Sequence, residues 1–173
     1  MIGFFSPTIF EVPPTLLYKT KTFGIGHKRA VALARKLEGS PFSKILIFGC
    51  AGALHENIRS GQIFLVETLS TGVRMEATDL FPNLPRAKLF SSKTIVTGTE
   101  KKREIQSLTQ ASLVDMEMEF LWEAATSATR KKFIFIRGVL DELNDGLFSM
   151  PYRWLNYQKN ISATLRQNLR ISD

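Results

Sequence analysis

Two short, almost wholly apolar segments constrain the fold of this chain more than any other feature: Lys44–Phe48 (KILIF) and Phe133–Ile136 (FIFI). Strands without polar alternation are typical of a sheet that other elements cover on both faces. Ile2–Phe5, Ile63–Val66 and Ser112–Val114 are further short apolar segments of this kind. The chain therefore needs helices on both sides of a central sheet.

Helical periodicity lies between and after these strands. Apolar residues recur on one face over His27–Leu37, over residues 118–125 and from Tyr152 onward, which predicts three helices. Thr94–Val96 is expected to be a weaker strand, and residues 70–92 are expected to be an irregular loop over a site or a dimer contact. Alternating strands and helices predict one α/β layered domain over residues 1–173.

The net charge of +7 raises the question of an anionic partner. The denser basic groups, Lys101–Arg103 and Arg130–Lys132, border apolar runs, so we expect them to be solvated helix ends. The single cysteine, Cys50, excludes an internal disulfide and suits a reducing compartment. No apolar run approaches the roughly 18 residues of a membrane span. We expect a cytoplasmic protein with no nucleic-acid or membrane partner.

Candidate site residues follow the predicted strands. A small-residue run, Gly49–Ala53, comes after KILIF and would let a ligand approach the backbone closely. Glu117 follows the Ser112–Val114 strand, Asp141 follows FIFI, and Glu11 lies shortly after the first strand. Taken singly, a carboxylate in such a position is more often a helix cap or a solvated turn residue than a catalytic group. Together they suit a sugar and base site, with one carboxylate for hydroxyls, one acid and one base for water.

Five segments also follow one another in a recognisable order. They are MIGFFSPTIFEV (Met1–Val12), FGIGHKRAVALA (Phe23–Ala34), ILIFGCAGAL (Ile45–Leu54) with its continuation Gly61–Val66, SLVDMEMEFL (Ser112–Leu121) and FIRGVLDELND (Phe135–Asp145). In this order they resemble the purine nucleoside phosphorylase and methylthioadenosine/S-adenosylhomocysteine nucleosidase superfamily, which includes futalosine hydrolase. The segment Val96–Thr99 (VTGT) resembles futalosine hydrolase more than the methylthioadenosine enzymes. The resemblance implies a shortened three-layer αβα sandwich with a mixed central sheet. It also implies a nucleosidase that hydrolyses N-glycosidic bonds as a homodimer, with no cofactor and no metal.

The resemblance implies a role for each candidate residue. Glu117 would bind the ribose 2′- and 3′-hydroxyls, with Met116 packed against the sugar. Asp141 would protonate or hydrogen-bond N7 of the purine, which makes the base a neutral leaving group. Glu11 would orient or deprotonate the attacking water. Three small residues would line the base and sugar pocket: Cys50, Ala51 and Gly52.

Two features leave alternatives to hydrolysis open. Leu140 stands where the family has a serine that helps to orient the acid, and the short chain implies a more open pocket. A catalytically weak member with a binding role is therefore one alternative. A phosphate-dependent phosphorylase is the other. Arg74 and Arg86 are available for phosphate, but neither lies in a matching motif, and Glu11 favours hydrolysis. The substrate remains a 5′-modified purine-type nucleoside of the methylthioadenosine, S-adenosylhomocysteine or futalosine class.

Overall fold

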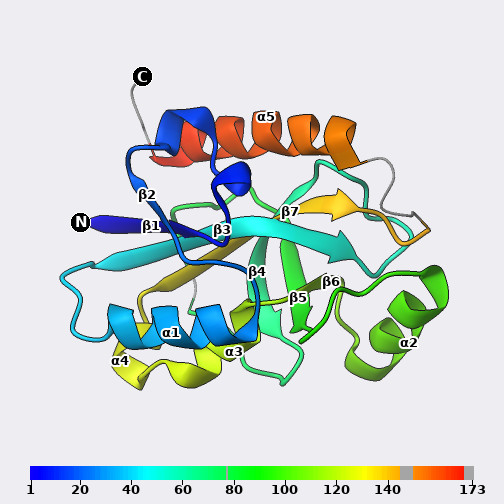
Figure 1. Ribbon diagram of the computed structural model, residues 1–173, viewed down its shortest axis with the longest axis horizontal. Coiled ribbons are helices and arrows are strands. Elements are labelled where there is room, and N and C mark those ends of the chain that lie inside the picture. Colours follow the sequence, from blue (N-terminus) through cyan, green and yellow to red (C-terminus); the bar gives the residue numbers. More distant parts are fainter. Residues whose placement is uncertain (77, 145–149, 170–173) are drawn as a thin grey trace.

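Strands form the centre of the protein (Figure 1). The computed structural model describes residues 1–76, 78–144 and 150–169. Within these residues the strands of the mixed sheet are, in chain order, β1 (Ile2–Ser6), β2 (Thr20–Thr22), β3 (Lys44–Ala53), β4 (Ile63–Leu69), β5 (Arg86–Ser91), β6 (Leu113–Asp115) and β7 (Phe133–Asp141).

The strand β3 lies at the middle of this sheet and pairs with three other strands. It runs parallel to β1 and β7 and antiparallel to β6. β7 pairs antiparallel with β4, β4 runs parallel to β5, and β5 runs parallel to β6. Five strands therefore close into a ring, while β1 and β2 extend from β3 as an open edge. The expected mixed central sheet is confirmed.

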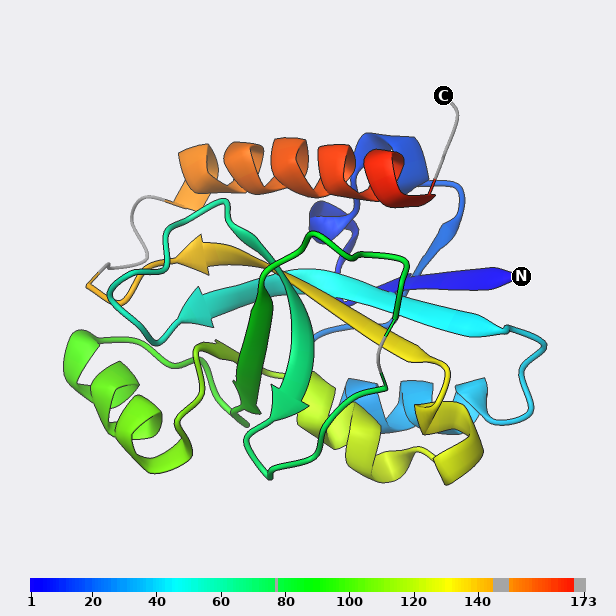
Figure 2. The same cartoon turned by 180° about the vertical axis from the view of Figure 1, so that it is seen from behind.

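Helices cover both sides of the sheet, as Figures 1 and 2 show. The helices of the described residues are α1 (His27–Leu37), α2 (Thr99–Thr109), α3 (Met118–Ala124), α4 (Ser127–Arg130) and α5 (Met150–Leu169), with the 3₁₀ turns η1 (Ile9–Glu11) and η2 (Pro14–Leu16). The long helix α5 lies on one face, and α1, α3 and α4 lie on the other. α2 stands apart at the end of the sheet, next to β6. The layers are those of an αβα sandwich.

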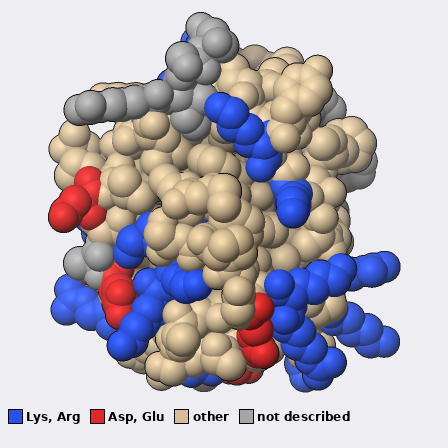
Figure 3. Space-filling model, turned by 90° about the vertical axis from the view of Figure 1, so that its left-hand side faces the viewer, with Lys and Arg blue, Asp and Glu red and all other residues tan. Residues whose placement is uncertain are grey.

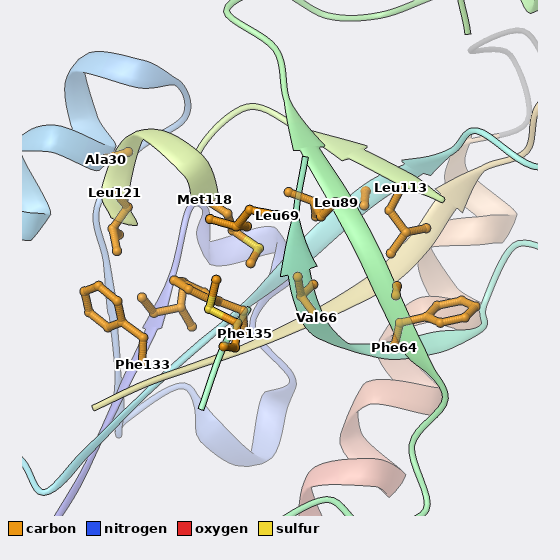
Figure 4. Close-up of a cluster of buried hydrophobic side chains, with 14 of the residues drawn as sticks. Ala30, Phe64, Val66, Leu69, Leu89, Leu113, Met118, Leu121, Phe133 and Phe135 are labelled. Carbon is orange, nitrogen blue, oxygen red and sulfur yellow. The ribbon is translucent and has the colours of Figure 1, made fainter. Parts of the chain in front are cut away.

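The apolar strands fill two cores because their alternate residues face opposite sides. In β3, Ile45 and Ile47 pack toward α1 and α3, whereas Leu46 and Phe48 belong to the core under α5. Residues 133–136 of β7 divide in the same way. Figure 4 shows the first core, where Phe133 and Phe135 lie with side chains from neighbouring strands and α3. Two-sided burial explains why these strands show no polar alternation.

A close contact between β7 and α5 gives the first testable prediction. Gly138 lies under the fully buried ring of Tyr157, and a methyl group there would lie 2.2 Å from the ring. We expect Gly138→Ala to lower the free energy of unfolding by about 3 kcal/mol in urea denaturation, because the crowded ring has nowhere to move.

A matched control for this prediction leaves the ring in place. Tyr157→Phe keeps the ring and loses only the hydroxyl that donates to the Glu11 carbonyl at 3.0 Å, so we expect a cost of about 1 kcal/mol. A cost for Gly138→Ala no larger than that of this hydroxyl would show that the ring can move away from an added methyl group.

The sequence predicted most of these elements but not all their bounds. The predicted helix His27–Leu37 is confirmed. The predicted strands KILIF and FIFI are also confirmed and are longer than expected, since β3 continues to Ala53 and β7 continues to Asp141. The prediction of a strand at Thr94–Val96 is wrong, because these residues form an irregular segment before α2. Residues 70–92 are not irregular throughout, since they contain β5. None of the described helices is long and apolar enough to span a membrane.

Candidate active site

A cleft with a volume of about 220 Å³ lies at the carboxyl ends of β3 and β7. It collects residues from β3, β6 and β7, from η1 and from the segment before α2. The predicted site residues all line it: Glu11, Cys50, Ala51, Gly52, Met116, Glu117 and Asp141. The remaining lining residues are Ile25, Thr94, Ile95, Val96, Val114, Asp115 and Leu140. The structure therefore brings the sequence candidates together in one place.

Glu11 enters the cleft from the turn η1. Its carboxylate accepts hydrogen bonds from the Ser6 hydroxyl at 3.2 Å and from the Thr8 backbone N–H at 3.3 Å. Burial raises the pKa of Glu11, while the positive charge of Arg137 and the bond from Thr8 act in the opposite direction. A side chain at Gly49 would lie 3.1 Å from the Glu11 carboxylate, so a residue without Cβ leaves room for it. Glu11 is thus a partly buried carboxylate held in a defined orientation.

A buried ion pair supports the floor of the cleft. The Arg137 guanidinium donates to one oxygen of Asp115 through Nε at 3.0 Å and through Nη2 at 2.7 Å. Both side chains are shielded completely from solvent. Asp115 also accepts the Ser91 hydroxyl at 2.5 Å and the Met118 backbone N–H at the start of α3. This network fixes the carboxyl end of β6, which Met116 and Glu117 follow directly in the chain.

Glu117 is a buried carboxylate at the N-cap of α3. It accepts a hydrogen bond of 2.9 Å from the backbone N–H of Gly26, which has a φ of 88° at the start of α1. Few residues other than glycine adopt this backbone angle, so the glycine supports the contact. Burial raises the pKa of Glu117 to about 7, with a further contribution from the charge of Asp115 and an opposing one from Arg137. Glu117 therefore changes its charge near neutral pH.

The small-residue run Gly49–Ala53 is part of β3, although the sequence predicted that it follows this strand. β3 pairs with β7 as far as Gly52 and Asp141, and with β6 at Gly52 and Ala53. Paired strands on both sides keep these residues extended. A side chain at Gly52 would lie 2.9 Å from the Asp141 carboxylate. Small residues on β3 therefore leave space for the carboxylates beside it.

Cys50 lines the cleft and is poorly suited to react as a nucleophile. Burial raises the pKa of its thiol well above the ordinary value, and the charge of Glu11 acts in the same direction. A thiol that resists ionisation is a poor nucleophile. This agrees with its predicted role as a small residue that lines the pocket.

Asp141 ends β7 with its side chain 26% exposed. Its carboxylate forms an ion pair with Lys102 of α2, whose ammonium also donates to the Glu142 carbonyl at 2.5 Å. Lys102 is completely buried, so the prediction of a solvated helix end is wrong at this residue. The neighbours Lys101 and Arg103 are 58% and 59% exposed, as expected. Asp145, the last residue of the fifth motif, lies outside the described residues.

Apolar side chains form the mouth of the cleft. Ile25 and Ile95 are among the large hydrophobic residues that remain exposed, and Val96 stands beside them in the same wall. Sequence analysis did not identify these residues, since Ile95 and Val96 were assigned to a strand. Among the described residues, no three or more His, Cys, Asp and Glu side chains come together in a way that could hold a metal ion.

The sequence itself matches no family model and no curated protein. Solved structures do match the fold. The 5′-methylthioadenosine/S-adenosylhomocysteine nucleosidase of Campylobacter jejuni superimposes with a TM-score of 0.80 at 13% identity, over 97% of each chain. Futalosine hydrolase of Helicobacter pylori strain 26695 gives a TM-score of 0.77 at 14% identity, over 96% of this chain and 97% of that one. The Helicobacter pylori methylthioadenosine nucleosidase gives 0.77 at 14% over 98% of each. The chain therefore has the fold of these nucleosidases.

Proposed function

We propose that this protein is a nucleosidase that hydrolyses the N-glycosidic bond of a 5′-modified purine-type nucleoside. The observation that carries the proposal is the convergence of Glu11, Glu117 and Asp141 on one cleft at the carboxyl ends of the strands. Ligands of α/β proteins commonly bind beyond the carboxyl ends of the sheet strands. The likeness to structures of futalosine hydrolase and of methylthioadenosine nucleosidase supports the same assignment.

The three carboxylates meet the three demands of the reaction. Cleavage of the bond leaves negative charge on the base and produces a cationic, oxocarbenium-like sugar, as in glycoside hydrolysis. Asp141 serves the base at N7, either as an acid or through a hydrogen bond. Glu117 binds the ribose 2′- and 3′-hydroxyls and stabilises the cation as it forms. Glu11 orients and deprotonates the water, and its raised pKa suits a base.

The charges around the cleft favour hydrolysis over phosphorolysis. Among the described residues that line it, none is Lys or Arg, although a phosphate co-substrate needs such groups. Arg74 and Arg86 lie at a separate cavity beside β4, where Arg74 pairs with Glu67 at 2.9 Å. The excess positive charge is on the outer surface, and Figure 3 shows Lys and Arg projecting from several places on one face. Water is therefore the nucleophile that we propose.

The apolar mouth indicates where the substrate differs from an ordinary nucleoside. Ile25, Ile95 and Val96 offer contact to an uncharged group but no hydrogen bond from their side chains. A methylthio group at the 5′ position has this character, whereas the homocysteine group of S-adenosylhomocysteine ends in an ammonium and a carboxylate. Among the candidate classes, we therefore place methylthioadenosine first.

We also propose that the protein works in the cytoplasm as a homodimer. Ile9, Phe10, Tyr152 and Leu155 are exposed apolar residues around η1 and the start of α5. These two segments are neighbours, since Trp154 donates to the Phe10 carbonyl at 2.6 Å. A second copy of the chain would remove this apolar surface from water.

Base release tests the proposal directly. Purified protein would be incubated with methylthioadenosine, S-adenosylhomocysteine, inosine and futalosine, each with and without phosphate. We expect phosphate-independent release from a 5′-modified substrate. Asp141→Asn and Glu11→Gln should each lower kcat by about a hundredfold, because each removes a proton-transferring group.

The outcomes separate the alternatives. Release that requires phosphate would show a phosphorylase and remove the role of Glu11. No release from any of the four substrates, together with ligand-induced thermal stabilisation, would show a binding member of the fold without this activity. Lys101→Met is the control for both variants, because Lys101 is an exposed residue of α2 whose ammonium pairs with Glu104 at 2.7 Å.

A further inference from the structure

Lys102 is a completely buried ammonium group that the proposed roles do not use. Burying a charge is unfavourable unless the group is paired and hydrogen-bonded. Its partners are the Asp141 carboxylate and the Glu142 carbonyl, both at the end of β7. The buried position of Lys102 is therefore tied to the residue proposed to serve the leaving base.

The first turn of α2 holds the end of β7 through three consecutive residues. Lys102 bonds to Asp141 and Glu142, and the Thr99 hydroxyl donates to the Leu143 carbonyl at 3.4 Å. Glu142 is also held from the other side, where its carboxylate accepts the Ser60 backbone N–H at 3.0 Å. Several contacts therefore fix the backbone that carries Asp141.

The carboxylate of Asp141 lies between Lys102 and the cleft wall. Oδ2 takes the bond from Lys102, and a Cβ atom at Gly52, a residue of the cleft wall, would lie 2.9 Å from Oδ1 and 3.2 Å from Oδ2. Lys102 itself does not line the cleft, so it would act on a substrate only through Asp141. Leu140, the residue before Asp141, has no hydroxyl that could hold the carboxylate. The structure leaves this task to Lys102.

We propose that Lys102 is the positioning residue of Asp141 and holds its carboxyl group in place for the leaving base. This inference rests on the proposed function. In the step, Asp141 takes a proton from solvent and passes it to N7 of the purine. The electron pair of the breaking C–N bond moves into the base, which leaves neutral. Asp141 returns to the carboxylate, which Lys102 holds in the same position for the next turnover.

Steady-state kinetics test this role. Lys102→Met keeps the length of the side chain and removes the charge. We expect kcat to fall at least about tenfold with KM changed less than about threefold. Lys102→Arg should restore most of kcat, since it keeps the charge.

The matched control Lys101→Met should leave kcat, KM and the melting temperature unchanged. A merely structural Lys102 would lower the melting temperature in Lys102→Met but leave kcat of the folded enzyme unchanged, which would overturn the inference alone. No base release from the wild type would instead overturn the proposed function and, with it, the catalytic role of the pair.

Discussion

Replacement of Arg137 by methionine is expected to lower the free energy of unfolding by about 3–5 kcal/mol. Arg137 is completely buried and donates twice to Asp115 at 2.7 and 3.0 Å. Methionine would leave the Asp115 carboxylate without its cation, in a site that also holds Glu117 and Glu11. Because a domain of this kind has only about 5–15 kcal/mol of stability, the variant should lose much of it. Urea denaturation at neutral pH measures the change.

The double variant Arg137→Met/Asp115→Asn is the matched control. Asparagine keeps an oxygen in place for the Met118 backbone N–H, which Asp115 accepts at 3.3 Å, but carries no charge. Replacing both members of a buried ion pair is often far less costly than removing one. We therefore expect the double variant to recover part of the lost stability. A loss below about 1 kcal/mol for Arg137→Met alone would show that the pair contributes little.

The layered fold follows from local patterns that can be read in the sequence. KILIF and FIFI alternate between two cores, so both of their faces are apolar and only a sheet covered on both sides accommodates them. The helix His27–Leu37 has the expected bounds because its apolar face and its glycine-rich start are both local. Elements of this kind are predictable without knowledge of the tertiary structure.

The missed elements depend on distant partners. Gly49–Ala53 has weak strand propensity, yet it is extended because β7 and β6 pair with it from two sides. Arg86–Ser91 lies after a proline-containing segment and is ordered by pairing with β4 and β6. α2 has a largely polar sequence, and only Lys102 and Ile105 of its residues are buried. Its short apolar face gives little periodicity to detect.

The candidate site also contains some residues that local sequence predicts and others that only the fold identifies. Glu11, Glu117 and Asp141 were identified because each follows a strand, and strand ends that meet at one edge bring such residues together. The partner of Asp141 could not be found in this way. Lys102 stands between two solvated cations, and only the ion pair across 39 residues of sequence distinguishes it from them. Local sequence therefore predicts the carboxylates, whereas the cations that control them require the fold.

Glu117→Gln is expected to lower kcat/KM by about a thousandfold, the largest effect on activity that we predict for the three carboxylates. Glutamine keeps an oxygen that can accept the Gly26 N–H, which the glutamate holds at 2.9 Å, so the local structure should persist. It lacks the negative charge that stabilises the cationic sugar. With the wild type, kcat/KM should rise as the pH increases through about 7, because burial raises the pKa of Glu117 to about 7 and the ionised form is required. The variant should lack this acid limb.

Stability against pH tests the same carboxyl without a substrate. The pKa of Glu117 is about 7 in the folded protein and 4.5 ordinarily, so the folded state binds the proton more tightly. The proton on Glu117 therefore stabilises the folded state. This stabilisation is complete below about pH 4.5 and is lost as the pH rises through about 7, by up to about 3 kcal/mol in the free energy of unfolding. Urea midpoints of the wild type should therefore fall over this window relative to those of Glu117→Gln. Glu11 also has a raised pKa, so Glu11→Gln is the control. If the acid limb and the stability slope vanish in Glu11→Gln and persist in Glu117→Gln, both belong to Glu11, and Glu117 does not control the charge of the site.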